Sequence, residues 1–179
     1  MTPADKPGNG PGIAPPASGG GSQPMVVINN QYVKDLSFEA PGGMKTFVAM
    51  QKTQPAITVN LDVQVTPFQD PANVYEVVLN IKAECKVGEA VGFIAELAYA
   101  GAFTLNVGKE HLQPVLLIEC PRVLFPFARN ILADVTRDGG FPPLMLGMMD
   151  FVGLYQARMA ELAKQQGQDQ SKPPGAANA

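Results

Sequence analysis

Charged residues are scarce in this sequence. Lys, Arg, Asp and Glu make up 16% of the 179 residues, whereas about 25% is usual for a soluble domain, and hydrophobic residues make up 46%. So few charges leave apolar surface uncovered, which normally marks an oligomer contact or a binding site. The net charge of −3 argues against a nucleic-acid partner, because phosphate binding requires clustered Lys and Arg.

Histidine and cysteine, the residues most used for catalysis and soft-metal binding, are also rare. His111 is the only histidine, and Cys85 and Cys120 are the only cysteines. A metal site needs three or four suitable ligands, and no segment supplies them. No nucleophile motif accompanies the histidine, so we expect a surface or capping role for it. We expect two reduced, partly buried thiols and predict neither an enzyme nor a cofactor.

Long apolar runs and nucleotide-binding loops are missing too. No apolar stretch approaches the roughly 18 residues that a membrane-spanning helix needs, and the N-terminal residues lack the apolar part of a signal peptide. The stretches "GGGS" and "GGMKT" lack the GK[ST] ending of a phosphate-binding loop. These absences favour a cytoplasmic protein that neither inserts into a membrane nor uses ATP.

Both ends of the chain have the composition of disordered tails. Half of residues 1–24 are Gly or Pro, and residues 165–179 are similarly poor in large apolar side chains. Such segments cannot bury enough surface to offset the entropy lost on ordering. We therefore predict one folded domain over residues 25–164.

Within that domain, period-two alternation predicts four strands. The clearest apolar row alternates with polar residues and consists of Ile57, Val59, Leu61, Val63 and Val65. A second alternating segment spans Tyr75–Val87. A turn around Gly88 then leads back, antiparallel, into a Gly- and Ala-rich strand at about Ala90–Leu105. The first strand is expected at about Val26–Phe38.

After Asn106 the apolar period becomes that of a helix. A helix from near Pro121 to Gly139 is predicted by a four-residue spacing, with Pro126 kinking it or delaying its start. The spaced residues are Val123, Phe127, Ile131 and Val135, flanked by Leu124 and Leu132. A second helix should begin after Asp150, a suitable N-cap, and end near Lys164.

Four strands followed by two helices, without βαβ alternation, predict an α+β domain with an antiparallel sheet. Two helices cover only one face of a four-stranded sheet well, and the predicted last strand is apolar on both sides. Exposed strand edges and apolar faces promote aggregation unless they are covered. We therefore expect a closed homo-oligomer to bury what the helices leave open.

The segment "VKDLSFEAP" carries two acids on a predicted strand, Asp35 and Glu39. Strand residues four apart point to the same face, about 13 Å from each other. That separation is too large for an acid–base pair. A solvated acidic face and a surface recognised by another protein both remain open.

Four segments together resemble the SecB family of bacterial protein-export chaperones. They are "YVKDLSFEAP" (Tyr32–Pro41), "VYEVVLNIKAE" (Val74–Glu84), "CPRVLFPFARNILADVTRDGGFPPLML" (Cys120–Leu146) and "DFVGLY" (Asp150–Tyr155). The resemblance runs from about Met25 to Leu162. It implies a four-stranded antiparallel sheet with two C-terminal helices, assembled as a homotetramer of two dimers.

The same resemblance implies an ATP-independent holdase. Such a protein binds unfolded secretory precursors, keeps them competent for translocation and delivers them to the translocase motor SecA. The implied partners are therefore precursors, SecA and further copies of the chain itself. The alternative is a SecB-like holdase that serves another system, such as a toxin–antitoxin pair, and the feature against it is the set Asp35, Glu39 and Glu96.

The resemblance also assigns roles to particular residues. SecA docking is assigned to Asp35, Glu39, Ile94 and Glu96. A groove for unfolded chains should be apolar and tolerant of sequence, a task that flexible methionines suit. The groove candidates are Phe38, Phe47, Ile57, Val59, Leu61, Met145, Met148 and Met149. For the strand row and the methionines, a role as ordinary core remains the alternative.

Overall fold

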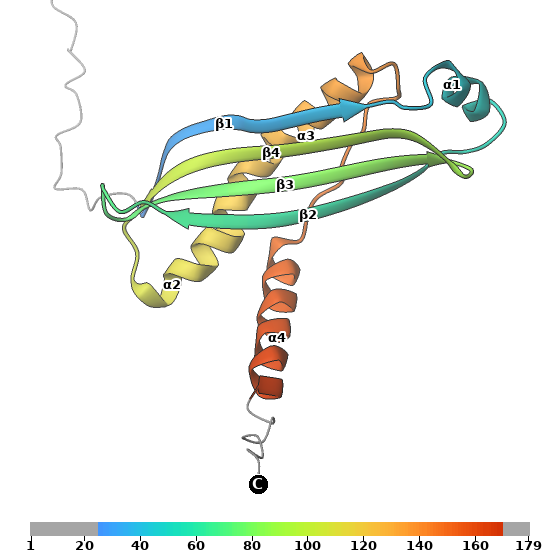
Figure 1. The fold of residues 1–179 in the computed structure, drawn as a ribbon. Helices are drawn as coiled ribbons and strands as arrows, with labels where there is room; N and C mark the ends of the chain where they lie inside the picture. The colour runs from blue at the N-terminus through green and yellow to red at the C-terminus, as the bar shows by residue number, and fades with distance from the viewer. Residues whose placement is uncertain (1–24, 170–179) are drawn as a thin grey trace, which may run out of the picture.

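Four strands form one antiparallel sheet, and a long helix crosses one of its faces (Figure 1). The structure is a computed structural model that describes residues 25–169, with side chains for residues 25–164. The tail predicted at residues 1–24 lies outside the described residues, as do residues 170–179 of the tail predicted at the other end.

The strands are β1 (Val26–Glu39), β2 (Ala56–Pro67), β3 (Val74–Val87) and β4 (Ala90–Leu105). All four were predicted, β2 and β3 from the alternation and β4 from the turn that precedes it, and the prediction is confirmed. The β3–β4 hairpin turns at Gly88, whose φ of 62° lies in the left-handed region that glycine adopts without strain.

The strand order is β1–β4–β3–β2, so β1 and β2 are the two edges. Every neighbouring pair is antiparallel. One face of β3 and β4 packs against the helices and is lined by buried residues that include Leu79, Ile81, Leu97 and Phe103. We call the opposite side, turned toward the viewer in Figure 1, the open face.

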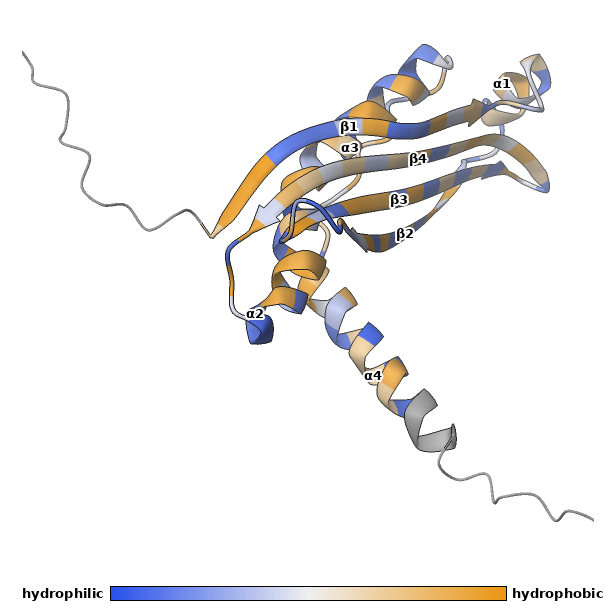
Figure 2. Cartoon of the chain, turned by 60° about the vertical axis from the view of Figure 1, so that its left-hand side comes forward, coloured by the Kyte–Doolittle hydropathy of each residue, from blue (hydrophilic) through white to orange (hydrophobic). Residues whose placement is uncertain are grey.

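The helix α3 (Cys120–Asp138) covers the packed face (Figures 1 and 2). It begins where the sequence predicts, and Pro126 lies inside it rather than delaying its start. The residues buried against the sheet are Leu124, Ala128, Leu132 and Thr136. The row that defined the predicted helix is half-buried or exposed, and Phe127 is 52% exposed. Both rows are apolar at the same period, so periodicity could not decide which one faces the sheet.

Two helical segments upstream of α3 escaped prediction. The helix α2 (Lys109–Pro114) and the π-helical η1 (Val115–Glu119) run into α3 without a break. Pro114 and Pro121 flank the π-helical segment, and each removes one backbone N–H donor from the helix. His111 lies in α2 with an exposed side chain, as expected. The two-turn helix α1 (Met44–Met50) was also missed, because seven residues are too few to show a period.

The last helix, α4 (Phe151–Asp169), begins as predicted. The carboxylate of Asp150 accepts a hydrogen bond of 2.9 Å from the backbone N–H of Gly153, as an N-cap does. The helix continues to Asp169, so the expected end near Lys164 was wrong. The residues after Leu162 include Ala, Lys and Gln, which are strong helix formers, and no Gly or Pro follows until Gly167.

Candidate docking face and apolar grooves

The predicted docking residues lie on the open face of the sheet. In the β1–β4 pairing, Ser37 stands opposite Glu96, Glu39 opposite Ile94 and Asp35 opposite Ala98. Residues that face each other across an antiparallel pair point to the same side of the sheet. The fold therefore brings Asp35, Glu39, Ile94 and Glu96 together, although more than fifty residues separate the two strands in sequence.

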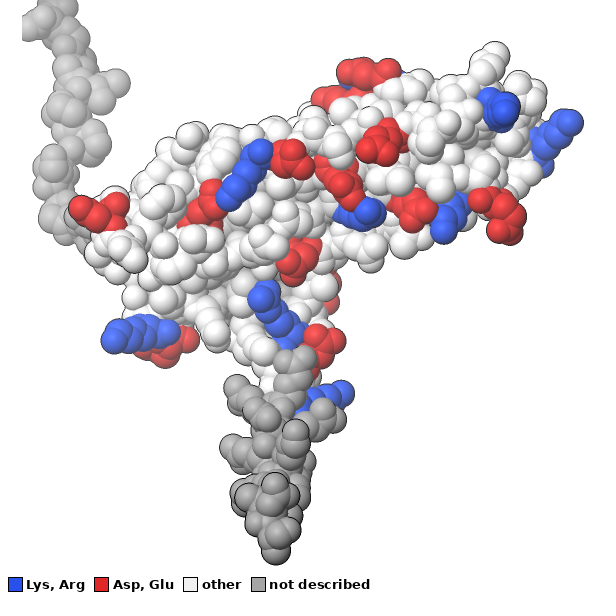
Figure 3. All heavy atoms as spheres, in the orientation of Figure 1, with Lys and Arg blue, Asp and Glu red and all other residues white. Residues whose placement is uncertain are grey.

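A lysine from β3 lies within this acidic set. Lys82 stands opposite Glu96 in the β3–β4 pairing, and its Nζ atom is 2.5 Å from Glu96 Oε1. The ion pair with Glu96 raises the pKa of Lys82, and the charges of Glu84 and Glu39 raise it further. In Figure 3, Asp and Glu alternate with Lys and Arg along this face. The open face is thus a row of carboxylates that a few lysines interrupt.

Nearer the other end of the open face, Glu76 forms a more buried cluster. Its carboxylate accepts hydrogen bonds from the hydroxyl of Tyr32 and from Lys34, whose Nζ lies 2.6 Å from Oε2. These two donors lower the pKa of Glu76, and the bond to Glu76 raises the pKa of Tyr32. These bonds join the edge strand β1 to β3. The charge of Lys34 balances that of Glu76, which is only 9% exposed.

Unfolded precursors are the clients of a holdase, and the row on β2 that is predicted to bind them is called the client row. It lies on the packed side of the sheet, along the edge that β2 forms. Ile57, Val59 and Leu61 pair with Cys85, Ala83 and Ile81, which are buried on the packed face. Because no helix covers this edge fully, Ile57 is 47% exposed, and Val59 and Leu61 are half-buried. The row therefore contacts the hydrophobic core on one side and remains partly accessible to solvent on the other.

The backbone of this row also points outward. The N–H of Phe68 donates to the carbonyl of Val74, which identifies that pair as hydrogen-bonded. Hydrogen-bonded and non-bonded pairs alternate along an antiparallel ladder. Continuing the alternation, the odd-numbered residues of β2 direct N–H and C=O away from β3. Exposed apolar side chains and outward backbone groups therefore belong to the same residues, Ile57, Val59 and Leu61.

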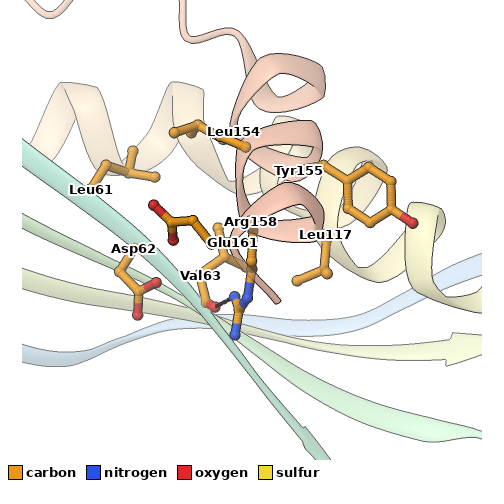
Figure 4. A pocket seen from close by; sticks show the side chains of 9 residues that line it. Leu61, Asp62, Val63, Leu117, Leu154, Tyr155, Arg158 and Glu161 are labelled. Carbon is orange, nitrogen blue, oxygen red and sulfur yellow. Dashed lines mark hydrogen bonds between the residues drawn. The ribbon is translucent and has the colours of Figure 1, made fainter. Parts of the chain in front are cut away.

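The side chain of Arg158, on α4, forms a hydrogen bond with one of these outward-pointing backbone carbonyls. Its guanidinium donates a hydrogen bond of 2.9 Å to the carbonyl oxygen of Val63 (Figure 4). Between α4, η1 and the β2 edge lies a cavity of about 410 Å³, lined by Leu61, Leu117 and Tyr155 among others. The helix α4 thus stands against the C-terminal half of β2, from Leu61 onward. Ile57 and Val59 line neither of the two cavities beside α4.

The aromatic groove candidates join one cluster at the α1 end of the sheet. The ring of Phe38 lies 5.7 Å from that of Phe93, and the ring of Phe47 lies 4.9 Å from that of Phe141. Phe93 and Phe141 are almost fully buried and connect the other two, with their ring centroids 5.0 Å apart. Phe38 and Phe47 are only partly buried, so they form the accessible part of this cluster.

The structure divides the methionine candidates between two places. Met145 shares a cavity of about 340 Å³ with Ile57, over a floor that includes Phe93 and Phe141. Met148 and Met149 line a separate cavity of about 450 Å³ with Phe125, Arg122 and Arg129. Met145 is therefore continuous with the aromatic cluster and the β2 row, and the other two methionines lie apart from them.

Comparison with known families agrees with this architecture. The family SecB, described as "Preprotein translocase subunit SecB", matches residues 20–162. The chain belongs to the SecB family. Its members are export chaperones rather than enzymes.

Curated relatives of this SecB-family chain share about half of its residues. A "Protein-export protein SecB" from Paramagnetospirillum magneticum is 57% identical over 145 residues, which cover 81% of this chain and 92% of the relative. Another from Rhodopseudomonas palustris is 48% identical over 161 residues, covering 89% of this chain and 98% of the relative.

A solved structure shares the fold. A SecB-like chaperone from Mycobacterium tuberculosis, in complex with a ChAD peptide from the HigA1 antitoxin, superposes with a TM-score of 0.58. The match covers 70% of this chain and 91% of the other, at 14% identity. The α+β fold expected from the resemblance is confirmed.

Sequence reasoning missed two side chains that shape the candidate sites of this SecB-family chain. Arg158 gave no signal, because its partner is a backbone carbonyl 95 residues away. Lys82 was visible only as one polar residue of an alternating strand. Among the described residues, no three His, Cys, Asp or Glu side chains could hold a metal ion. No described helix is long and apolar enough to cross a membrane.

Proposed function

We propose that this protein is an ATP-independent holdase that binds unfolded precursors along the β2 edge and delivers them to SecA through the open face. One observation carries the proposal: Ile57, Val59 and Leu61 combine apolar side chains that are at least partly exposed with backbone groups that point outward. Unfolded chains have in common only apolar side chains and unpaired backbone groups. A strand edge that offers partners for both binds them without regard to sequence.

The apolar surface extends from this edge. The cavity that Ile57 shares with Met145 leads toward the cluster that contains Phe38 and Phe47. An extended segment pairing with β2 could place apolar side chains in that cavity, and methionine adapts readily to side chains of different shape. Met148 and Met149 lie in another cavity and are a weaker part of this proposal.

The open face supports delivery to a basic partner. Asp35, Glu39 and Glu96 are acids on a sheet face that none of the described helices covers, beside the apolar Ile94. Acids arranged in this way attract a basic surface, speed association and set the register of docking. Since the client row belongs to the packed side, a precursor and SecA would engage different surfaces at the same time.

Self-association into a homotetramer is part of the proposal. Ile28, Val33 and Leu36 on β1 and Phe127 on α3 are large apolar residues, each more than a third exposed in the single chain. An apolar strand edge beside an apolar helix row is a surface that a second copy would cover. The proposal also places the protein in the cytoplasm, where precursors are held before export.

The first test is binding of an unfolded secretory precursor, without nucleotide, beside the same precursor in folded form. We expect binding of the unfolded form at micromolar or tighter affinity and none of the folded form.

A docking test then uses Glu39→Lys and Glu96→Lys, with Glu110→Lys in the exposed part of α2 as a control for net charge. The first two should weaken SecA binding and leave precursor binding intact.

The second candidate function, a holdase for an antitoxin-like client, is favoured by one observation. The structural relative from Mycobacterium tuberculosis was solved with an antitoxin peptide, although the similarity extends to the fold alone. If reversal of the open-face acids left SecA affinity unchanged while unfolded clients still bound, this second function would replace the first.

A further inference from the structure

The acids of the open face are not equally available to a partner. Glu96 is paired with Lys82 at 2.5 Å, and the side chains of both are about half exposed. Asp35 and Glu39 lie within 4.0 Å of no basic side chain among the described residues. A basic partner therefore meets two unpaired acids and one that already holds a cation.

A hollow of about 270 Å³ lies beside the Lys82–Glu96 pair. The open-face residues around it include Asn60, Asp62 and Asn80. Asp62 makes no ion pair with any described residue, and the side-chain nitrogen of Asn80 is buried without a hydrogen-bond partner. The hollow thus offers carboxylates to an incoming cation on two sides.

We propose that Lys82 is an internal competitor on the docking face: it occupies Glu96 in the free protein and yields it when an arginine or lysine of the partner enters the hollow between Asp62 and Glu96. This inference rests on the proposed function, because it concerns the same face. It extends the docking surface from β1 and β4 across β3 to β2.

The strength of the ion pair makes such an exchange feasible. An exposed ion pair contributes little to stability, so a well-placed partner cation can replace it. A loosely fitting basic surface gains too little at Glu96 to displace Lys82. Lys82 therefore lowers the affinity of the docking face for every basic surface. The loss is smallest for a partner whose cation reaches the hollow, so Lys82 favours that partner over other basic proteins.

The test is the affinity of Lys82→Gln for SecA, measured by titration at two salt concentrations. Loss of an ion pair of this size corresponds to about two- to fivefold tighter binding. Lys109→Gln, which removes the same charge from α2, should bind as the unaltered protein does. Equal melting temperatures of the two variants verify that the fold is unchanged.

A double-mutant cycle with Glu96→Gln assigns the effect to the pair. If Lys82 competes at Glu96, the gain from Lys82→Gln disappears in the Glu96→Gln background. Unchanged or weaker binding of Lys82→Gln would overturn the competitor role, provided that Glu39→Lys and Glu96→Lys still weaken docking. If those two reversals also had no effect, the docking face itself would be wrong, so the two failures are distinguishable.

Discussion

The guanidinium of Arg158 donates a hydrogen bond of 2.9 Å to the carbonyl oxygen of Val63, on the edge strand 95 residues earlier. Through this bond the last helix covers part of an edge that otherwise presents its backbone outward. The helix α4 and an added client strand would therefore compete for the same end of β2. The length of edge that a client can use depends on whether this contact is closed.

Replacing Arg158 with Ala should lengthen the usable edge and tighten the binding of unfolded precursors. A hydrogen bond from an exposed charged group contributes about 1 kcal/mol, so we expect up to about a fivefold lower Kd. Fluorescence titration with a labelled unfolded precursor measures the change. Arg137→Ala removes an exposed arginine of α3 that pairs with Asp134, and it serves as the matched control. Equal or weaker binding of Arg158→Ala would mean that clients do not reach this end of the edge.

Glu76 should make stability depend on acidic pH. Its pKa is lowered in the folded state by Lys34 and Tyr32, so its contribution is present above the unfolded value near 4.3 and is lost as pH falls through the folded pKa. Replacing Glu76 with Gln should lower the free energy of unfolding by about 1 kcal/mol at neutral pH. Urea titrations between pH 7 and pH 3 should show the two proteins converging in acid.

The matched control for this pH effect is Glu84→Gln. Glu84 also lies on β3 and pairs with Lys86 at 3.4 Å, but both side chains are more exposed than Glu76. An exposed pair contributes little to stability, so the control should unfold nearly as the unaltered protein does at every pH. A constant difference between Glu76→Gln and the unaltered protein down to pH 3 would contradict the role of the carboxylate charge.

The hydroxyl of Thr136 joins the end of α3 to the loop that carries Met145. It accepts a hydrogen bond of 2.9 Å from the backbone N–H of Leu144 and donates to the carbonyl of Leu132 at 2.8 Å. Thr136→Val keeps the shape and leaves that N–H unpaired near the core, which costs about 1–3 kcal/mol. Thermal unfolding measures this loss, and Thr136→Ser, which keeps the hydroxyl, should recover most of it. Equal loss in both variants would point to packing instead.

The strands β2 and β3 were predictable because apolar and polar residues alternate along them with a period of two, and β4 because it follows the turn at Gly88. The pairing of Lys82 with Glu96 was not. The register beside the turn, Val87 with Ala90, would place Lys82 opposite Ala95 on the other side of the sheet. An irregularity between Cys85 and Lys86 shifts the ladder by one residue, and only then does Lys82 face Glu96.

Long-range contacts account for the other failures of prediction. The faces of α3 have similar apolar rows, and the sheet, not the helix period, decides that Leu124 and Leu132 are buried. The pairing of β1 with β4 could not be predicted either, because no local signal in the sequence says which strands pair. The hydrogen bond of Arg158 could not be predicted for the same reason. Any residue has a backbone carbonyl that can accept it, so the residue type of the partner gives no signal.

Cys120 and Cys85 should be inert in the folded protein. The sequence predicted reduced thiols, and both cysteines are free and buried. Burial raises the pKa of Cys120 to about 12, with the neighbouring Glu119 contributing, and burial also raises the pKa of Cys85. Since the thiolate is the reactive form, the rate of reaction with a disulfide reagent at pH 8 should be set by local or global opening of the fold rather than by thiol ionisation.

The two thiols should nonetheless differ from each other, because Cys85 lines the cavity that Ile57 and Met145 share, whereas Cys120 is the buried first residue of α3. Opening of that cavity exposes Cys85 without global unfolding, so Cys120→Ala should be modified faster than Cys85→Ala. An unfolded precursor bound in the cavity should slow the modification of Cys85 and leave that of Cys120 unchanged. Equal protection of both thiols by the precursor would instead indicate general stabilisation, and no protection would place the client elsewhere.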